Sequence, residues 1–407
     1  MTEPEPTPSP GARGGRARAL PAAHPLGHTL WGTSNRALST PGARTLKGTG
    51  RATVIGAGSF GTALAVLLAR GGLRTTLQTR TAEQAELIER ERENGRYLPG
   101  VELPAQLRVE GPSAVLSRAD YVFLAVPSSG LAAVIDRLGA AGLGRRTAVV
   151  SLAKGLVAPH TVKGAPQGAQ AGGVPPTSVL SARFGAERVA CVGGPAHAQE
   201  MVSEGAALVA ASADEQLARA IAQVFTRAGV VCELSNDPIG VELAGAAKNA
   251  AALAAGATEA QGMNAAGAAA GHIFAEVWRY AEQLGARPES MIGLAGAGDL
   301  VATVLARESR NRRAGELLAA GVPAADIPAR VGQAVEALES VPLLAHALGV
   351  AGVSAPVTTA LARLISGELP LADWVALVRA TVPPAALWRR RPQPGFWRRA
   401  WRRLGGR

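Results

Sequence analysis

Cysteine is scarce: the 407 residues include only Cys191 and Cys232, far apart and without a CxxC motif. The pair therefore offers no metal-binding pattern, and free thiols fit a reducing compartment, so we expect a cytoplasmic protein without a metal. Long apolar runs are lacking as well. No run reaches the roughly 18 residues needed to cross a bilayer, and we expect no transmembrane segment.

Acidic residues are almost absent from the two ends of the chain. The formal net charge is +11, but residues 1–51 carry +5 and residues 389–407 carry +8, which leaves −2 for the residues between them. The basicity is therefore not a property of the folded body. This distribution disfavours nucleic-acid binding by the protein as a whole, and we expect no nucleic-acid partner.

Residues 1–49 are rich in Pro, Gly, Ala, Ser, Thr and Arg and show no helical or strand periodicity. This composition predicts a disordered extension. Its Arg and Ser content resembles an organellar targeting peptide, although Glu3 and Glu5 fit that interpretation poorly. A bacterial extension, or a start codon assigned too far upstream, is an alternative.

From Ala52 the pattern changes to short apolar strands that alternate with helical stretches. Such alternation is typical of an α/β domain with a mainly parallel sheet, and we expect a Rossmann-type domain over residues 50–235. Residues 158–178 interrupt the pattern and predict a flexible surface loop. The expected strands lie at 73–80, 121–127, 147–155, 188–195 and 206–212.

After about Asn236 the strand signals end and Ala- and Gly-rich helical stretches follow. We expect an all-helical domain over residues 236–388. The small residues would let neighbouring helices approach closely.

Gly56, Gly58 and Gly61 form a GxGxxG motif after a predicted strand and at the start of a predicted helix. In this context the motif indicates a dinucleotide site, because the glycines allow a tight turn and the helix N-terminus offers free N–H groups to a pyrophosphate. An ordinary strand–helix turn is the alternative.

At the end of the second strand, where an acid usually binds the ribose, the chain has Arg80. Arginine there can pair with a 2′-phosphate, which favours NADP over NAD, while a solvated surface arginine is the alternative.

Two lysines are candidates for the chemistry. Lys154 follows a predicted strand, at the edge where open α/β sheets place their ligands. Lys248 lies inside an apolar helix, where burial would lower its pKa and make it a better proton donor near neutrality. A lysine within a helix is otherwise more often solvated.

Further along, Asp299 ends the glycine-rich sequence LAGAGDL and, taken alone, is better explained as a helix N-cap. Ser309 is a predicted N-cap, and it places Arg310 and Asn311 at a helix N-terminus, which is a natural phosphate site. A solvated arginine cluster is the alternative.

Several motifs occur in one order: GAGSFGTALA, NGRYLPGVELP, AVPSS, AKGL, GGPAHAQE, AAKNAAALAAG, GLAGAGDL, SRNRR and GQAVEA. Together they resemble the NAD(P)-dependent glycerol-3-phosphate dehydrogenase family in its bacterial form, from about residue 52 to 365. The resemblance implies reduction of dihydroxyacetone phosphate to sn-glycerol 3-phosphate with NAD or NADP, in support of glycerophospholipid synthesis. It also suggests a homodimer formed through the helical domain.

The resemblance implies roles for matching positions. Lys248, Lys154 and Asp299 would be catalytic. The substrate would contact these three residues and Gly194, Ser309, Arg310 and Asn311. The cofactor would contact Gly56, Gly58, Ser59, Phe60, Gly61, Arg80, Lys154, Ala198, Arg310 and Glu336.

The sequence departs from the family pattern at two places. Ala196 stands where Ser or Thr is usual, and His272 replaces one of the residues usual in its helix. A related two-domain reductase of another 2-keto or 2-hydroxy compound, or a non-catalytic dinucleotide-binding module, is therefore an alternative function. The SRNRR motif favours the dehydrogenase over a reductase of another compound, because a substrate without a phosphate would leave Arg310 without an anionic partner.

The basic tail at 389–407 has an amphipathic pattern. Aromatic and apolar residues would share one helical face and arginines the other, which is typical of a helix at an anionic membrane surface. A solvated arginine tail is the alternative, and we expect peripheral membrane contact as one possibility. The apolar face would consist of Phe396, Trp397, Ala400, Trp401 and Leu404.

Overall fold

The computed structural model describes residues 50–113, 116–158, 172–306 and 309–382, which all belong to one compact unit. The expected disordered extension 1–49 and the amphipathic tail 389–407 lie outside the described residues. Among those described, no single helix is long and apolar enough to cross a membrane. One bent pair, Pro288–Leu305 with Arg310–Ala319, passes by length and composition alone.

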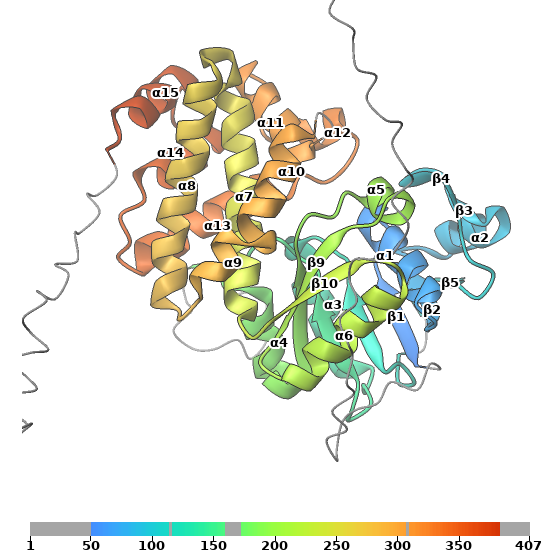
Figure 1. Cartoon of the computed structure of the whole chain (residues 1–407). Coiled ribbons are helices and arrows are strands. Elements are labelled where there is room, and N and C mark those ends of the chain that lie inside the picture. Colours follow the sequence, from blue (N-terminus) through green and yellow to red (C-terminus); the bar gives the residue numbers. More distant parts are fainter. Residues whose placement is uncertain (1–49, 114–115, 159–171, 307–308, 383–407) are drawn as a thin grey trace, which may run out of the picture. The chain divides into compact units, whose positions relative to one another are not determined.

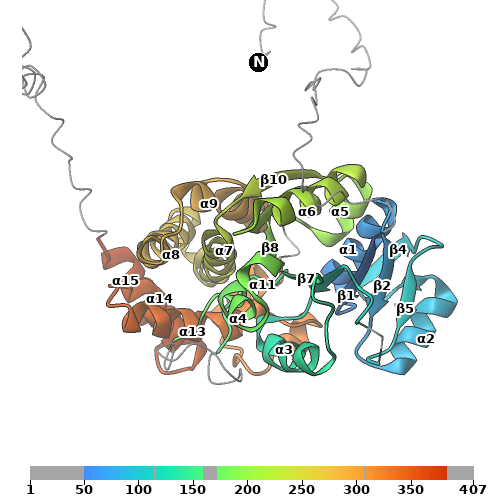
Figure 2. The ribbon, with the colours of Figure 1, turned by 90° about the horizontal axis from the view of Figure 1, so that it is seen from below.

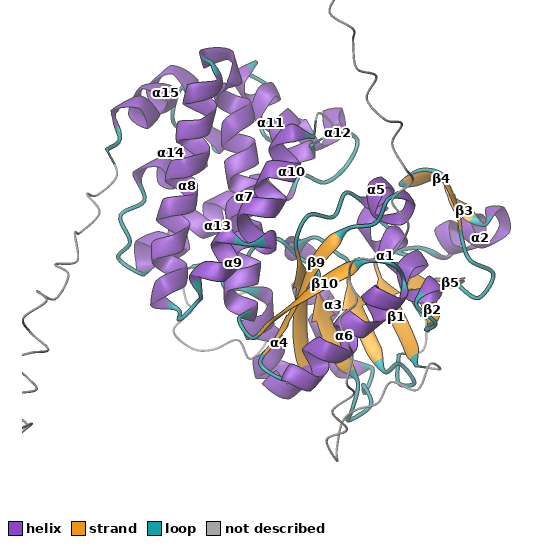
Figure 3. Ribbon diagram, in the orientation of Figure 1, coloured by secondary structure: helices purple, strands orange, loops and turns teal. Residues whose placement is uncertain are grey.

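Within the described chain the strands all lie between residues 51 and 235, and Figure 3 shows most of them gathered beside a part made of helices. They are β1 (Arg51–Ile55), β2 (Arg74–Gln78), β3 (Glu93–Asn94), β4 (Leu98–Glu102), β5 (Arg108–Glu110), β6 (Tyr121–Leu124), β7 (Ala148–Ser151), β8 (Val189–Gly193), β9 (Ala207–Ser212) and β10 (Val231–Ser235). The helices among them are α1 (Ser59–Arg70), α2 (Ala82–Glu91), η1 (Ser128–Gly130), α3 (Leu131–Ala140), α4 (Pro176–Phe184), η3 (Ala186–Arg188), α5 (Ala198–Ser203) and α6 (Glu215–Arg227).

Eight of these strands form one sheet in the order β10-β9-β8-β7-β6-β1-β2-β5, in which only the β8–β9 pair is antiparallel. Helices α1 and α6 lie on one face of the sheet, and α3 and α4 lie on the other (Figures 1 and 2). Their apolar side chains belong to two separate core clusters. The strand order reverses between β1 and β6. Ligands of doubly wound sheets bind at the carboxyl ends of the strands at such a reversal, so this crevice is where a site is expected.

The rest of the described chain is helical. Its elements are α7 (Pro238–Thr258), η4 (Glu259–Gln261), α8 (Met263–Gln283), α9 (Pro288–Ile292), the π-helix η5 (Leu294–Gly298), α10 (Asp299–Leu305), α11 (Arg310–Ala319), α12 (Ile327–Val331), α13 (Glu336–Val350), α14 (Pro356–Ile365) and α15 (Leu371–Ala380). The predicted fold class, a Rossmann-type region followed by an all-helical region, is confirmed. Buried residues of the sheet, Cys191 and Val209 among them, share one core cluster with α7.

Two buried glutamates on the long central helices fix the starts of shorter helices. Glu242 of α7 accepts hydrogen bonds from the Thr177 N–H and hydroxyl at the start of α4. Glu276 of α8 accepts from the Thr358 N–H and hydroxyl at the start of α14. Of the expected flexible loop 158–178, residues 159–171 lie outside the described residues. Residues 172–178 are instead mostly buried, because Thr177 is held in this way and Val174 pairs with Val157.

Candidate active site

The glycine turn lies between β1 and α1, at the reversal of the strand order. Gly56 has a φ of +112°, and a Cβ there would press on the carbonyl group of Ala125, just after β6. A Cβ at Gly61 would overlap the carbonyl oxygen of Gly56, so α1 could not approach the turn. A Cβ at Gly58 would meet nothing within 4 Å, so open space lies over the turn. This is the geometry that a pyrophosphate requires.

Lys154 follows β7 at the same edge of the sheet. Its ammonium donates to the carbonyl oxygen of Gly194 (3.0 Å), which follows β8, and forms an ion pair with Asp299 Oδ2 (2.6 Å). Gly245 of α7 lies close to this lysine: a Cβ there would be 3.2 Å from the Lys154 side chain, a tight contact. The sheet and the helical region therefore meet at Lys154.

Lys248 projects from the middle of α7 and is 7% exposed. Its ammonium lies 3.6 Å from Asp299 Oδ2, so the carboxylate stands between two lysines. Burial lowers the pKa of Lys248 to about 8; the charges of Lys154 and Arg310 act in the same direction, while Asp299 and Glu336 oppose the shift. A lysine in this state can both donate and accept a proton near neutrality.

Asp299 is the first residue of α10 and follows the π-helix η5. The sequence taken alone suggested that Asp299 caps the helix, but its side chain does not do so, and Gly298 is the N-cap. Burial opposes ionisation of Asp299, but Lys154 and Lys248 hold its pKa below the ordinary value. Short π-helical turns are common at functional sites, and this one directs the carboxylate toward the two lysines.

Ser309 is the N-cap of α11, as predicted, and its hydroxyl accepts from the Arg312 N–H (3.4 Å). Arg310 is exposed and donates to Gln333 Oε1 and to the Ala334 carbonyl oxygen. Within the described part of the chain its guanidinium makes no ion pair, so it can still bind an anion. Free N–H groups at the same helix end favour a negative charge there.

Asn249 joins these parts, although the sequence analysis did not single it out. Its side-chain amide donates to the Lys154 carbonyl oxygen (3.0 Å) and to Glu336 Oε2 (3.2 Å), and its oxygen accepts from Asn311 (2.8 Å). Glu336 Oε1 in turn accepts from the Ser128 N–H after β6. The sequence signal that could have identified Asn249 is its place beside Lys248 in a largely apolar helix.

The structure thus brings Lys154, Lys248 and Asp299 into contact and links Gly194, Asn311 and Glu336 to them. Apart from Arg310, which opens α11, the remaining predicted cofactor residues follow the carboxyl ends of strands, and among the described contacts none joins them directly to the lysines. Ser59 and Phe60 open α1, Arg80 is exposed after β2, and Ala198 opens α5.

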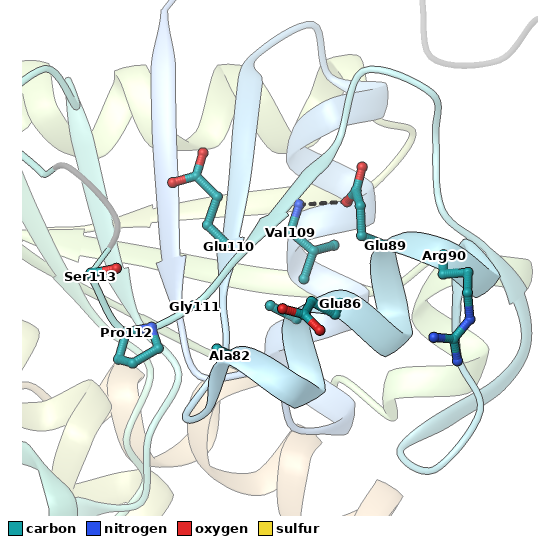
Figure 4. Close-up of a pocket in the computed structure, with 10 residues that line it drawn as sticks. Ala82, Glu86, Glu89, Arg90, Val109, Glu110, Gly111, Pro112 and Ser113 are labelled. Atoms are coloured by element: carbon teal, nitrogen blue, oxygen red, sulfur yellow. Dashed lines mark hydrogen bonds between the residues drawn. The ribbon is translucent and has the colours of Figure 1, made fainter.

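An open pocket lies elsewhere, between α2 and β5 (Figure 4). Its lining includes three acids, Glu86, Glu89 and Glu110, and Glu89 accepts a hydrogen bond from the Val109 N–H. These carboxylates would repel an anionic cofactor or substrate, and the pocket contains no predicted site residue. Among the described residues, no group of three or more His, Cys, Asp or Glu could hold a metal.

A doubly wound sheet with a glycine turn at its reversal, and a helical region that brings a buried lysine to the same edge, define a dinucleotide-dependent dehydrogenase. Residues 51–218 match the family model for the N-terminus of NAD-dependent glycerol-3-phosphate dehydrogenase, and residues 237–376 match the model for its C-terminus. The chain belongs to this family.

Named relatives agree with this assignment. The NAD(P)+ glycerol-3-phosphate dehydrogenase of Deinococcus radiodurans is 38% identical over 328 residues, which cover 79% of this chain and 92% of that protein. The Thermus thermophilus protein of the same name is 38% identical and covers 81% of this chain and 98% of its own. The crystal structure of glycerol-3-phosphate dehydrogenase from Coxiella burnetii has a TM-score of 0.73 and 28% identity, covering 82% of this chain and all of that chain.

Proposed function

We propose that the protein catalyses the NAD(P)-dependent interconversion of dihydroxyacetone phosphate and sn-glycerol 3-phosphate, as the names of its relatives indicate. The observation that carries the proposal is the placement of Lys248. This buried ammonium lies beside Asp299 and Lys154 at the edge of the sheet that bears the glycine turn. Supply of glycerol 3-phosphate to glycerophospholipid synthesis follows from the activity.

Lys248 serves as the acid for ketone reduction in this proposal. Negative charge develops on the carbonyl oxygen as C2 is reduced, and the Lys248 ammonium stabilises that oxygen and gives it a proton. In the opposite direction the neutral amine takes the proton from the C2 hydroxyl. Asp299 holds both ammonium groups in place, and Lys154 contributes a second positive charge to the oxygen.

The substrate phosphate binds at the start of α11. The Arg310 guanidinium, the Ser309 hydroxyl and the first N–H groups of the helix provide donors for its oxygens, and Asn311 fixes this end of the helix to Asn249. The phosphate is remote from the reacting carbon, so its binding energy can position the carbonyl against Lys248. Gly194 offers main-chain contact beside Lys154.

The glycine turn fits a dinucleotide, because Gly58 leaves open space above the N-terminus of α1. Gly56, Gly58, Ser59, Phe60 and Gly61 would hold the pyrophosphate, with the adenosine end near Arg80 and the nicotinamide end near Lys154, Ala198, Arg310 and Glu336. The reduced nicotinamide supplies the hydride when bound. Exposed Arg80 can pair with a 2′-phosphate, and we expect a modest preference for NADPH over NADH.

One assay tests the activity. Purified protein with dihydroxyacetone phosphate should oxidise NADH or NADPH, and Lys248→Met, which keeps the volume but removes the charge, should lower kcat by about a hundredfold or more. Exposed Arg363 of α14 provides a control, because Arg363→Met removes a cation whose ion pair, with Glu368, involves no residue of the site. Failure of the unaltered protein to oxidise either cofactor would favour a reductase of another substrate, and full turnover by Lys248→Met would refute the mechanism.

A homodimer formed through the helical region and a cytoplasmic location are part of the same proposal. The dimer rests on the family resemblance: Met263 and Ile292 are exposed apolar residues of the helical region, but Met263 begins α8 and Ile292 lies beyond its other end, so they form no single patch. Light scattering during size-exclusion chromatography measures the mass; a monomeric mass at micromolar concentration contradicts the dimer.

Peripheral membrane contact through residues 389–407 rests on the sequence alone. Arginines and tryptophans on opposite faces would attract the tail to anionic lipid, where the product is consumed. Sedimentation with vesicles that contain anionic lipid tests the idea. Removal of residues 389–407 should abolish co-sedimentation, and unchanged sedimentation would refute it.

A further inference from the structure

Two carbonyl groups of the glycine turn accept hydrogen bonds on the side that faces the protein interior, through a network that begins at a residue outside the turn. Asn94 ends β3, in a two-stranded hairpin with β4, and is 2% exposed. Its side-chain amide donates to the Ala57 carbonyl oxygen (3.0 Å) and to Thr62 Oγ1 (2.8 Å). The Thr62 hydroxyl donates in turn to the Gly58 carbonyl oxygen (2.8 Å), which also accepts the Thr62 main-chain N–H (2.9 Å).

These contacts determine where the N–H groups of the turn point. In a trans peptide the C=O and N–H groups lie on opposite sides. With the Ala57 and Gly58 carbonyls directed inward to Asn94 and Thr62, the N–H groups of Gly58 and Ser59 are directed outward. Among the described residues neither N–H has a hydrogen-bond partner, and the space over Gly58 is open.

The hairpin that carries Asn94 is itself firmly held. Leu98 and Leu103 are buried in the core cluster that includes α1. The Arg92 guanidinium donates to the carbonyl oxygens of Pro104 and Leu107, just beyond the hairpin. Asn94 therefore cannot move away from the turn without disturbing this packing.

We infer that Asn94 is a positioning residue of the cofactor site: with Thr62 as a relay, it aims the Gly58 and Ser59 N–H groups at the pyrophosphate. The inference rests on the proposed function, since it assumes that a dinucleotide binds at the turn. Asn94 touches neither substrate nor the reacting atoms, so its effect falls on cofactor binding and not on the chemical step.

The test measures NADPH affinity without substrate, by fluorescence of the bound cofactor, together with steady-state rates. In Asn94→Ala both hydrogen bonds are lost and the turn is no longer held in its binding orientation, so the Kd and KM for NADPH should rise by about tenfold, which corresponds to about 1.4 kcal/mol of binding free energy. The KM for dihydroxyacetone phosphate should not change, and the effect should appear in KM for NADPH rather than in kcat. Asn94→Asp, which has the same shape but places acceptor against acceptor, should bind at least as weakly.

Thr62 supplies the second pair of variants should Asn94→Ala fail to fold. Thr62→Val removes the relay and should weaken NADPH binding, while Thr62→Ser keeps the hydroxyl and should restore it. Equal Kd values for the unaltered protein and for Thr62→Val or Asn94→Ala would overturn the inference. A fall in kcat together with a rise in both KM values would overturn it as well. If the unaltered protein binds no NADPH, the proposed function fails as well; if it binds and the variants bind equally, only the role of Asn94 is refuted.

Discussion

In the proposed mechanism, the charge of a single group, Lys248, sets the pH dependence of both reaction directions. With a pKa of about 8, the ammonium that reduction requires is present below pH 8 and is lost above it. The rate of reduction should therefore fall about tenfold per pH unit above 8, and the rate of glycerol 3-phosphate oxidation, which requires the neutral amine, should fall in the same way below 8. Initial rates measured in both directions across this range test the assignment; parallel profiles would contradict it.

A second prediction concerns Asp299, whose negative charge acts on the pKa of Lys248 in the opposite direction to burial. The Asp299 carboxylate favours the charged form of Lys248 and so raises its pKa against the effect of burial. Asp299→Asn removes this charge, and the pKa of Lys248 should move below 8, so that the decline in reduction begins at lower pH. Asp299→Glu keeps the charge and serves as the control. A decline displaced to higher pH in Asp299→Asn would show that another group titrates.

Sequence reasoning named Lys154, Lys248 and Asp299 because their short motifs carry the family resemblance. It missed Asn94 and Asn249 for a physical reason. The partners of Asn94 lie more than 30 positions away and those of Asn249 up to 95, and some of them are main-chain oxygens that no motif records. The N-cap predicted for Asp299 alone was wrong because the π-helix before it continues directly into α10.

Between elements, the contact of α7 with α11 sets the distance from Lys248 to the proposed phosphate site. Gly315 of α11 lies against the α7 main chain, where a Cβ would overlap the Leu253 carbonyl oxygen. Gly315→Ala should force the helices apart and lower the free energy of unfolding by about 1–3 kcal/mol. The displaced start of α11 should also raise the KM for dihydroxyacetone phosphate.

Gly267 of α8 provides a matched control for this substitution. It is also a helical glycine, but a Cβ there would meet nothing within 4 Å. Gly267→Ala should therefore raise the free energy of unfolding by about 0.5–1 kcal/mol, as the helix propensity of alanine dictates. Urea unfolding of both variants measures the two effects; destabilisation of similar size at both positions would refute the close-contact explanation.

The elements that the sequence predicted are those with a continuous apolar run, such as β6 and β7, in which every residue is buried. β10 gave no such signal, because its edge position leaves its residues half-buried or exposed. β3 spans two residues and depends on its pairing with β4, a tertiary contact that local pattern does not report. Length and burial therefore decided which elements were found.

On the scale of the molecule, the sheet and the helical region share one core. Cys191 of β8 and Val209 of β9 are buried in the same cluster as Leu243 and Ala247 of α7. The ion pair of Lys154 with Asp299 joins the same two parts. The shared contacts imply that neither part keeps its packing when the other unfolds.

Unfolding should therefore occur in a single transition, and one thiol can report on it. Cys191 is 1% exposed and lies at the boundary, and burial raises its pKa well above the ordinary value, so its thiol should resist modification in the native protein. In the Cys232→Ser variant, which leaves Cys191 as the only cysteine of the chain, thiol reactivity and far-UV circular dichroism should change at the same urea concentration. Reactivity that appears before the helical signal is lost would mean that the two regions separate first and that the shared core does not couple them.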